Sequence, residues 1–216
     1  MKKWLEKVDW IYVIVPLALL GTFWVIAAFT GQWPWQSNPY NSYALQTDSW
    51  LKGRLDLGQN YEWLELAIYQ GKYFVSFPPF PSYVLIPFVV LFGTNTPDHF
   101  IALVVTIIGC IYAVKLYRET SAEKQHSLFW VLMLYFASGY LFVGMNGYVW
   151  FIAQSMSFTL SLMALYYTLR NKGGLALTFW ACAVGCRPML ALYGILLVYL
   201  LVKGYKKENP KGTVWQ

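Results

Sequence analysis

The residues best suited to chemistry lie in the long polar segment over residues 38–82, where Asp48 and Asp56 are the candidates for a catalytic base. At 100° per residue, a helix over residues 42–55 places Asp48 on the same side as its apolar residues. An ionisable group aimed at the apolar phase is costly and indicates function. An ordinary helix salt bridge between Asp48 and Lys52, four residues later, is the alternative interpretation.

Aromatic residues surround this carboxylate. Tyr40, Tyr43 and Trp50 are amphipathic and typical of a membrane–water interface. The sequence therefore predicts that the helix lies along a membrane surface and does not cross the membrane.

Basic and polar side chains complete the candidate site. A guanidinium can bind two phosphate oxygens, while a positioned carboxylate takes the proton from an attacking hydroxyl. This combination suits a lipid-linked anionic substrate, whereas plain solvation of a loop would also explain Arg54 and Lys72. The predicted substrate-binding residues are Arg187, Lys72, Arg54, Glu65, Tyr43 and Asn146.

The amino-acid composition indicates whether the chain folds in water or in a membrane. Of its 216 residues, 58% are hydrophobic and 12% are charged, against about 25% charged residues in soluble domains. This predicts an integral membrane protein. The net charge of +6 is scattered in short clusters between apolar runs, which is typical of cytoplasmic membrane loops and argues against nucleic acid as a partner.

The cysteines and histidines predict no metal site and no cofactor. Cys110, Cys182 and Cys186 lie inside apolar runs without His or acidic companions, so they are interpreted as packing residues. His99 and His126 stand alone at segment ends. They lack the paired spacing of a metal site.

We expect an all-α fold, a polytopic helical bundle of about six transmembrane helices that forms a single transmembrane domain over residues 1–216. Residues 10–29 are long enough to cross the hydrocarbon core of about 30 Å. An outer loop with juxtamembrane helices follows over residues 30–98, and the other transmembrane helices lie within residues 99–202. Among these, spans are expected over residues 100–117, 128–143 and 151–169. Lysines before the first helix predict a cytoplasmic N-terminus.

Two segments decide the topology. The apolar run over residues 83–92 is short for a span, and if it crossed, later basic clusters would lie outside, against the positive-inside rule. We therefore expect it to lie at the outer surface, or to dip in and return. The run over residues 175–202 contains Arg187 and Pro188, which favours two short helices with Arg187 at the outer turn. The alternative is one kinked helix with a buried Arg187.

Four strings resemble bacterial members of the GT-C glycosyltransferase superfamily, related to protein O-mannosyltransferases and the aminoarabinose transferase. They are DSWLKGRLDL, AIYQGKYFVSFPPFPSYVLIPFVVLFG, GYVWFIAQ and GCRPML. The resemblance implies an acidic base in the first outer loop, matched here by Asp48, with Asp56 also a candidate. It also implies a basic residue at the outer end of a short helix, matched by Arg187. The chain resembles the N-terminal part or a reduced member of that family.

The expected function is inverting transfer of a sugar from a polyprenyl-phosphate donor to a glycan, lipid or protein acceptor on the outer face of the bacterial inner membrane. The alternative is a non-catalytic protein that binds or carries polyprenyl-linked sugars. A transporter ranks last, because the chain shows no convincing internal repeat.

Overall fold

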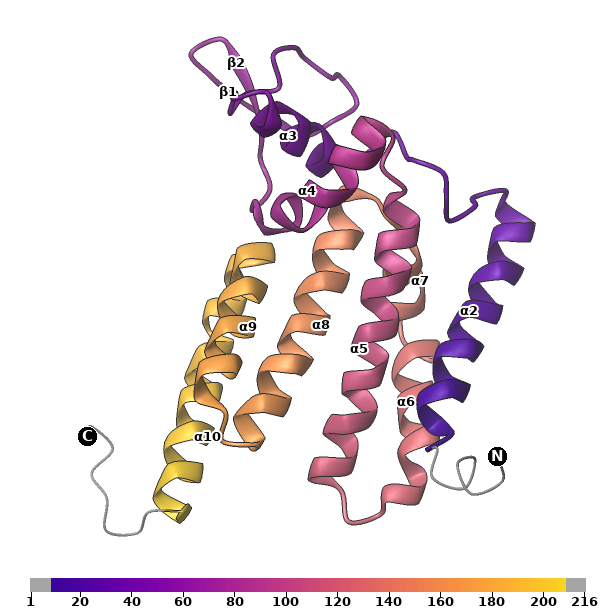
Figure 1. Ribbon diagram of the computed structural model, residues 1–216, viewed down its shortest axis with the longest axis vertical. Helices are drawn as coiled ribbons and strands as arrows, with labels where there is room; N and C mark the ends of the chain where they lie inside the picture. Colours follow the sequence, from indigo (N-terminus) through magenta and orange to yellow (C-terminus); the bar gives the residue numbers. More distant parts are fainter. Residues whose placement is uncertain (1–8, 209–216) are drawn as a thin grey trace.

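The computed structural model describes residues 9–208, so the predicted domain limits at residues 1 and 216 and the first lysines lie outside the described residues. The long helices run along one direction, and a small cap covers one end of them (Figure 1). The helices are α2 (Ile11–Thr30), α3 (Ser42–Leu51), α4 (Phe80–Phe92), α5 (Asp98–Thr120), α6 (Ser127–Phe136), α7 (Tyr140–Met145), α8 (Val149–Leu169), α9 (Gly173–Cys186) and α10 (Tyr193–Glu208).

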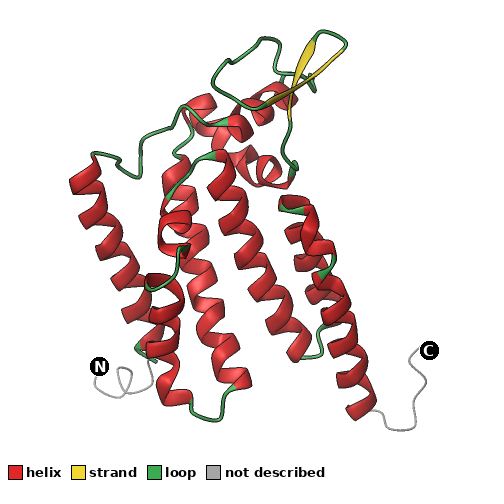
Figure 2. Cartoon of the chain, turned by 180° about the vertical axis from the view of Figure 1, so that it is seen from behind, coloured by secondary structure: helices red, strands yellow, loops and turns green. Residues whose placement is uncertain are grey.

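The two ends of the bundle differ in the segments that they carry. The capped end carries α3, α4 and the hairpin of strands β1 (Leu66–Tyr69) and β2 (Lys72–Val75). The charged end carries the α5–α6 connection at residues 121–126 and the α8–α9 turn at residues 170–172. Both ends of the described chain also lie at the charged end (Figure 2).

Four helical segments are long and apolar enough to cross a membrane, namely Ile11–Thr30, Asp98–Thr120, Val149–Leu169 and Pro188–Lys206. They indicate an integral membrane protein. The prediction of about six transmembrane helices is wrong by this measure, because α9 has 14 residues. At 1.5 Å per residue it spans only about 21 Å.

The predicted span over residues 128–143 is interrupted, which accounts for the other missing helix. α6 ends at Phe136 and α7 begins at Tyr140. The Ser138 hydroxyl donates to the Leu134 carbonyl at 2.6 Å and accepts the Tyr140 N–H at 3.1 Å. A serine that bonds to the backbone in this way, next to a glycine, is a recognised cause of a helix break.

The predicted division of residues 175–202 is confirmed. α9 ends at Cys186, Arg187 is extended with φ −143° and ψ 104°, and a 3₁₀ turn over Pro188–Ala191 leads into α10. Proline has no N–H and disfavours helical geometry in the residue before it. The alternative of one continuous kinked helix is therefore wrong.

The segment over residues 83–92 belongs to α4, which lies across the capped end against α3 and the ends of α8 and α9 (Figure 1). Its 13 residues are too few for a span. This agrees with the expectation that the segment does not cross.

The first loop differs from the all-α expectation by its hairpin. β1 and β2 are antiparallel, with Leu66 opposite Val75 and Tyr69 opposite Lys72. Gln70 and Gly71 both have positive φ, of 49° and 72°. A two-residue turn with this geometry matches the twist of the strands. The sequence interpretation treated this stretch as loop.

Candidate functional site

Asp48 forms an ion pair with Lys52 at 2.6 Å. The salt-bridge interpretation of Asp48 is therefore realised. Of the residues expected on the apolar side, Ala44 is buried, Leu51 is 51% exposed and Leu55 lies beyond the end of α3. α3 packs against α4 through Tyr43 and Ala44, and a buried polar contact joins the two helices. The Thr47 hydroxyl donates to the Ser82 carbonyl at 2.8 Å.

A polar hollow of about 240 Å³ lies beside this ion pair. Asp48, Lys52 and Arg54 line it, together with Leu45, Ser49, Leu57, Gly58, Gln59 and Tyr61. Two of the predicted residues, Asp48 and Arg54, thus share one site. α3 ends at Leu51, four residues before the predicted end at residue 55. Gly53 adopts a φ of +72°. This backbone geometry favours glycine and ends the helix.

The Asp56 carboxylate, in the turn after α3, forms a hydrogen bond and an ion pair. One carboxylate oxygen accepts the Gly58 N–H at 3.1 Å, and the other lies 3.9 Å from the Lys72 ammonium. The next residue, Leu57, donates its N–H to the Tyr73 carbonyl of β2 at 2.8 Å. Asp56 and Lys72 therefore help to attach the loop after α3 to the hairpin.

Trp150, at the start of α8, connects two predicted site residues. Its carbonyl oxygen accepts a hydrogen bond from the Arg187 guanidinium at 2.6 Å. Its indole N–H donates to the Glu65 carboxylate at 3.3 Å. Among the described residues, no carboxylate lies within ion-pair distance of Arg187. The guanidinium is half-buried and keeps donors free for an anion.

Tyr43 is buried close to this guanidinium. Its ring contacts Phe77 at 6.4 Å, and its hydroxyl has no hydrogen-bond partner among the described residues. Burial raises the pKa of Tyr43, and the nearby Arg187 lowers it by less. The phenol therefore stays protonated at neutral pH.

An elongated crevice of about 390 Å³ begins one helical turn below the contact between Arg187 and Trp150. It lies between α7, α8 and the segment after Arg187, and is lined by Tyr140, Gln154, Ser157, Phe158, Ser161, Leu162, Leu190 and Tyr193. The Leu190 N–H donates to the Arg187 carbonyl at 3.0 Å, so a residue of the crevice wall is held close to the Arg187 backbone.

Asn146 lies apart from these groups. It lines a different cavity, with His99 and residues of α2 and α7, and its amide donates to the Phe142 carbonyl at 2.7 Å. The structure thus brings together Arg187, Glu65 and Tyr43, and separately Asp48 with Arg54. Asn146 joins neither set.

Sequence reasoning missed a buried carboxyl at the capped end. Asp98, the first residue of α5, is 2% exposed and accepts a hydrogen bond from Asn38 at 2.9 Å. The same Asn38 amide donates to the Gly147 carbonyl at 3.2 Å. Pro97 and Asp98 before an apolar run signal a helix start, but nothing local indicates the burial. This contact ties the first loop to the α7–α8 turn.

Residues 9–208 contain no group of three or more His, Cys, Asp or Glu side chains placed to hold a metal ion. The cysteines Cys110 and Cys186 are buried and Cys182 is half-buried, and all three thiols are free.

The four strings that carry the resemblance meet at the capped end. Trp50 of the first contacts Tyr83 of the second, with ring centroids 4.8 Å apart. Phe77 of the second contacts Trp150 of the third at 6.4 Å. Trp150 in turn accepts the hydrogen bond from Arg187 of the fourth. Segments more than 100 residues apart in sequence therefore form one site.

No known protein family, curated protein or solved structure matches this chain.

Proposed function

We propose that the protein is a GT-C-type membrane glycosyltransferase that transfers a sugar from a polyprenyl-phosphate donor to a glycan, lipid or protein acceptor. The observation that carries the proposal is the half-buried Arg187, which has one carbonyl acceptor and no carboxylate partner among the described residues. Such a guanidinium retains donors that suit two oxygens of a phosphate. The crevice beneath it accommodates an apolar chain.

Each group then has a role in an inverting displacement. The acceptor hydroxyl oxygen attacks the anomeric carbon, and its proton moves to a carboxylate. The bond from the anomeric carbon to the phosphate oxygen breaks, and the phosphate leaves with the electron pair. Arg187 stabilises the negative charge that develops on the leaving phosphate.

The base in this proposal is Glu65 ahead of Asp48 and Asp56. Among the described groups, the Glu65 carboxylate accepts only from the neutral indole of Trp150, and Trp150 also contacts Arg187. Asp48 and Asp56 each lie beside a lysine. An ion pair with lysine already engages one oxygen of each of these carboxylates. These contacts favour Glu65.

The charge distribution supports placing the capped end on the outer face of a bacterial inner membrane and the N-terminus in the cytoplasm. Within residues 9–208, the capped end carries four basic residues, Lys52, Arg54, Lys72 and Arg187. The others lie toward the charged end: Lys115, Arg118, Lys124, Arg170, Lys172, Lys203, Lys206 and Lys207. An excess of lysine and arginine is typical of cytoplasmic loops.

Transfer of a labelled sugar from polyprenyl-phosphate donors, in membrane vesicles containing the full chain, tests the proposal. Arg187→Gln should lower transfer on the order of 100-fold, because one transition-state donor is removed. Arg170→Gln is the matched control, since Arg170 lies at the charged end beside Glu119 at 3.4 Å. Equal transfer by native protein and Arg187→Gln would contradict the role of Arg187.

A second candidate is a non-catalytic protein that binds or carries the same donor lipid. The crevice and Arg187 suffice for binding, and they favour this candidate if no carboxylate acts as a base. It predicts donor binding without transfer by the native chain. Binding would survive Glu65→Gln and Asp48→Asn and weaken in Arg187→Gln.

A further inference from the structure

A second cavity, of about 360 Å³, lies between α2 and α7, near the capped end. Its body is apolar and its polar groups gather at one end. The lining residues are Phe23, Ile26, Ala27, Thr30, Gln32, His99, Leu141, Phe142, Met145 and Asn146. This volume is within the usual range of small-molecule sites.

His99 is the most deeply buried polar side chain in this lining, at 4% exposure. Its Nδ1 accepts the Gly147 N–H at 3.2 Å. The same Nδ1 lies 3.4 Å from the Met145 carbonyl oxygen. In a neutral ring one nitrogen donates and the other accepts. No described residue forms a hydrogen bond with Nε2, so the cavity presents a ring nitrogen that is free to bond with a ligand.

The neighbouring amides supply acceptors. Asn146 uses its NH₂ group on the Phe142 carbonyl, and Gln32 uses its NH₂ group on the Tyr148 hydroxyl at 3.0 Å. Both carbonyl oxygens have no partner among the described residues. Each NH₂ group also keeps a second N–H, so this end of the cavity offers both donors and acceptors, which matches hydroxyl groups because they both donate and accept. Neither lysine nor arginine lines this cavity, so it offers a phosphate no counter-charge.

We expect the apolar body to lie against the bilayer. α2 is one of the candidate spans, and the cavity wall includes Phe142, which is 62% exposed. Phe29, beside the wall on α2, is 88% exposed. In a membrane protein such side chains meet lipid. A ligand therefore reaches the cavity laterally, from the hydrocarbon.

We infer that this cavity binds a neutral membrane lipid with a free hydroxyl group, of the diacylglycerol type, with its hydroxyl at His99 and an acyl chain between α2 and α7. The site is separate from Arg187 and the crevice below it, because the two cavities share no lining residue. The inference does not depend on the proposed transferase activity.

The test uses the full chain in vesicles that contain diacylglycerol with a photoactivatable group in one acyl chain. Cross-linked peptides mapped by mass spectrometry should include residues 22–30 and 140–146. Ala27→Phe should reduce this labelling about tenfold by filling the cavity, because Ala27 is 2% exposed and lines it. Ala28→Phe, at the next and exposed position, should leave it unchanged.

Photoactivatable phosphatidic acid with the same chains tests the ligand class. It should label these peptides less than diacylglycerol does, and equal or stronger labelling would overturn the assignment to a neutral headgroup. Equal diacylglycerol labelling of both variants would overturn the site itself. If Ala27→Phe fails to fold, the native chain decides, since labelling confined to other membrane-facing peptides also overturns the site.

Discussion

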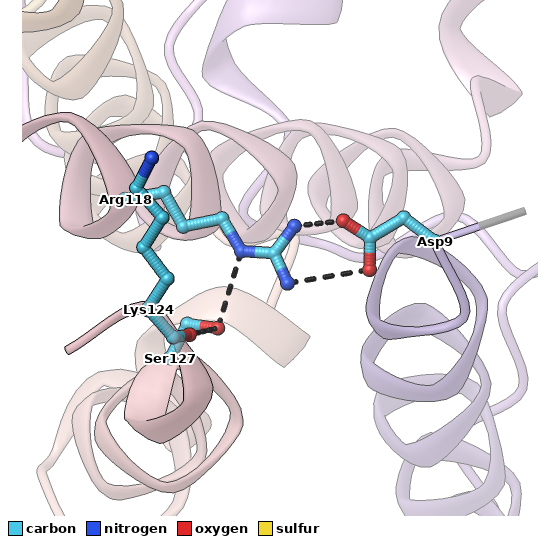
Figure 3. A network of polar contacts seen from close by, with 4 residues as sticks. All are labelled: Asp9, Arg118, Lys124 and Ser127. Atoms are coloured by element: carbon cyan, nitrogen blue, oxygen red, sulfur yellow. Dashed lines mark hydrogen bonds and ion pairs between the residues drawn. The ribbon is translucent and has the colours of Figure 1, made fainter. Parts of the chain in front are cut away.

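Two arginines at opposite ends of the bundle have very different surroundings. At the charged end, Arg118 donates to both carboxylate oxygens of Asp9, one contact being 3.2 Å, and to the Ser127 hydroxyl at 3.3 Å (Figure 3). Its guanidinium also lies 5.6 Å from the centre of the Tyr12 ring. At the capped end, Arg187 has one carbonyl acceptor. The first arginine is satisfied by the fold, and the second is left available.

The carboxylates repeat this contrast. At the charged end, Glu119 pairs with Arg170 at 3.4 Å and Glu123 lies 3.3 Å from His126. At the capped end, Glu65 is held by the indole of Trp150 and has no cation beside it among the described residues. The charged side chains at the charged end therefore form ion pairs that hold helices together. At the capped end, Asp48 and Asp56 are likewise paired with lysines. The Glu65 carboxylate and the Arg187 guanidinium lie close to Trp150 and have no ion-pair partner among the described residues.

The largest effect on sugar transfer is expected at the carboxylate proposed as the base. Glu65→Gln should lower sugar transfer on the order of 1000-fold, because general base catalysis contributes about 10²–10⁴. Asp48→Asn should have a much smaller effect, since Asp48 is paired with Lys52. Glu62→Gln, an exposed neighbour, is the control. Loss of transfer in Asp48→Asn alone would return the role of base to Asp48.

Removing the ion pair at the charged end should affect stability and leave transfer per folded molecule unchanged. Arg118 is 26% and Asp9 44% exposed, so solvent screens the pair. A double-mutant cycle of Asp9→Asn and Arg118→Gln, measured by unfolding in mixed micelles, should give a coupling of about 1 kcal/mol. A fall in transfer comparable to that of Arg187→Gln would abolish the distinction between the two arginines.

The smallest effect is expected at the surface pair of α3. Lys52 is 60% exposed and four residues from Asp48. Lys52→Gln should lower the free energy of unfolding by no more than about 0.5 kcal/mol. The same variant sharpens the comparison of carboxylates, because it releases Asp48 from its cation. If Asp48 were the base, freeing it from its ion pair would change the rate of transfer, whereas a base at Glu65 predicts no change.

Much of the architecture was accessible from the sequence. Hydropathy located the four long spans, since a bilayer requires about 20 apolar residues in a row. The pairing of Arg187 with Pro188 predicted where the last apolar run divides, because proline limits its own backbone and that of the preceding residue. The count of spans failed at residues 128–143, where the break depends on hydrogen bonds of one serine, Ser138.

The site was predictable as a set of residue types and not as an arrangement. Asp48, Asp56 and Glu65 are equivalent acidic residues of one loop in the sequence, and their partners separate them: lysines for the first two and an indole for the third. The burial of Asp98 and His99 likewise depends on a loop more than 40 residues away. Sequence alone determines which groups can ionise and which segments prefer lipid, because these are local properties. Only the tertiary structure decides which charges are neutralised, because that depends on distances between segments far apart in the chain.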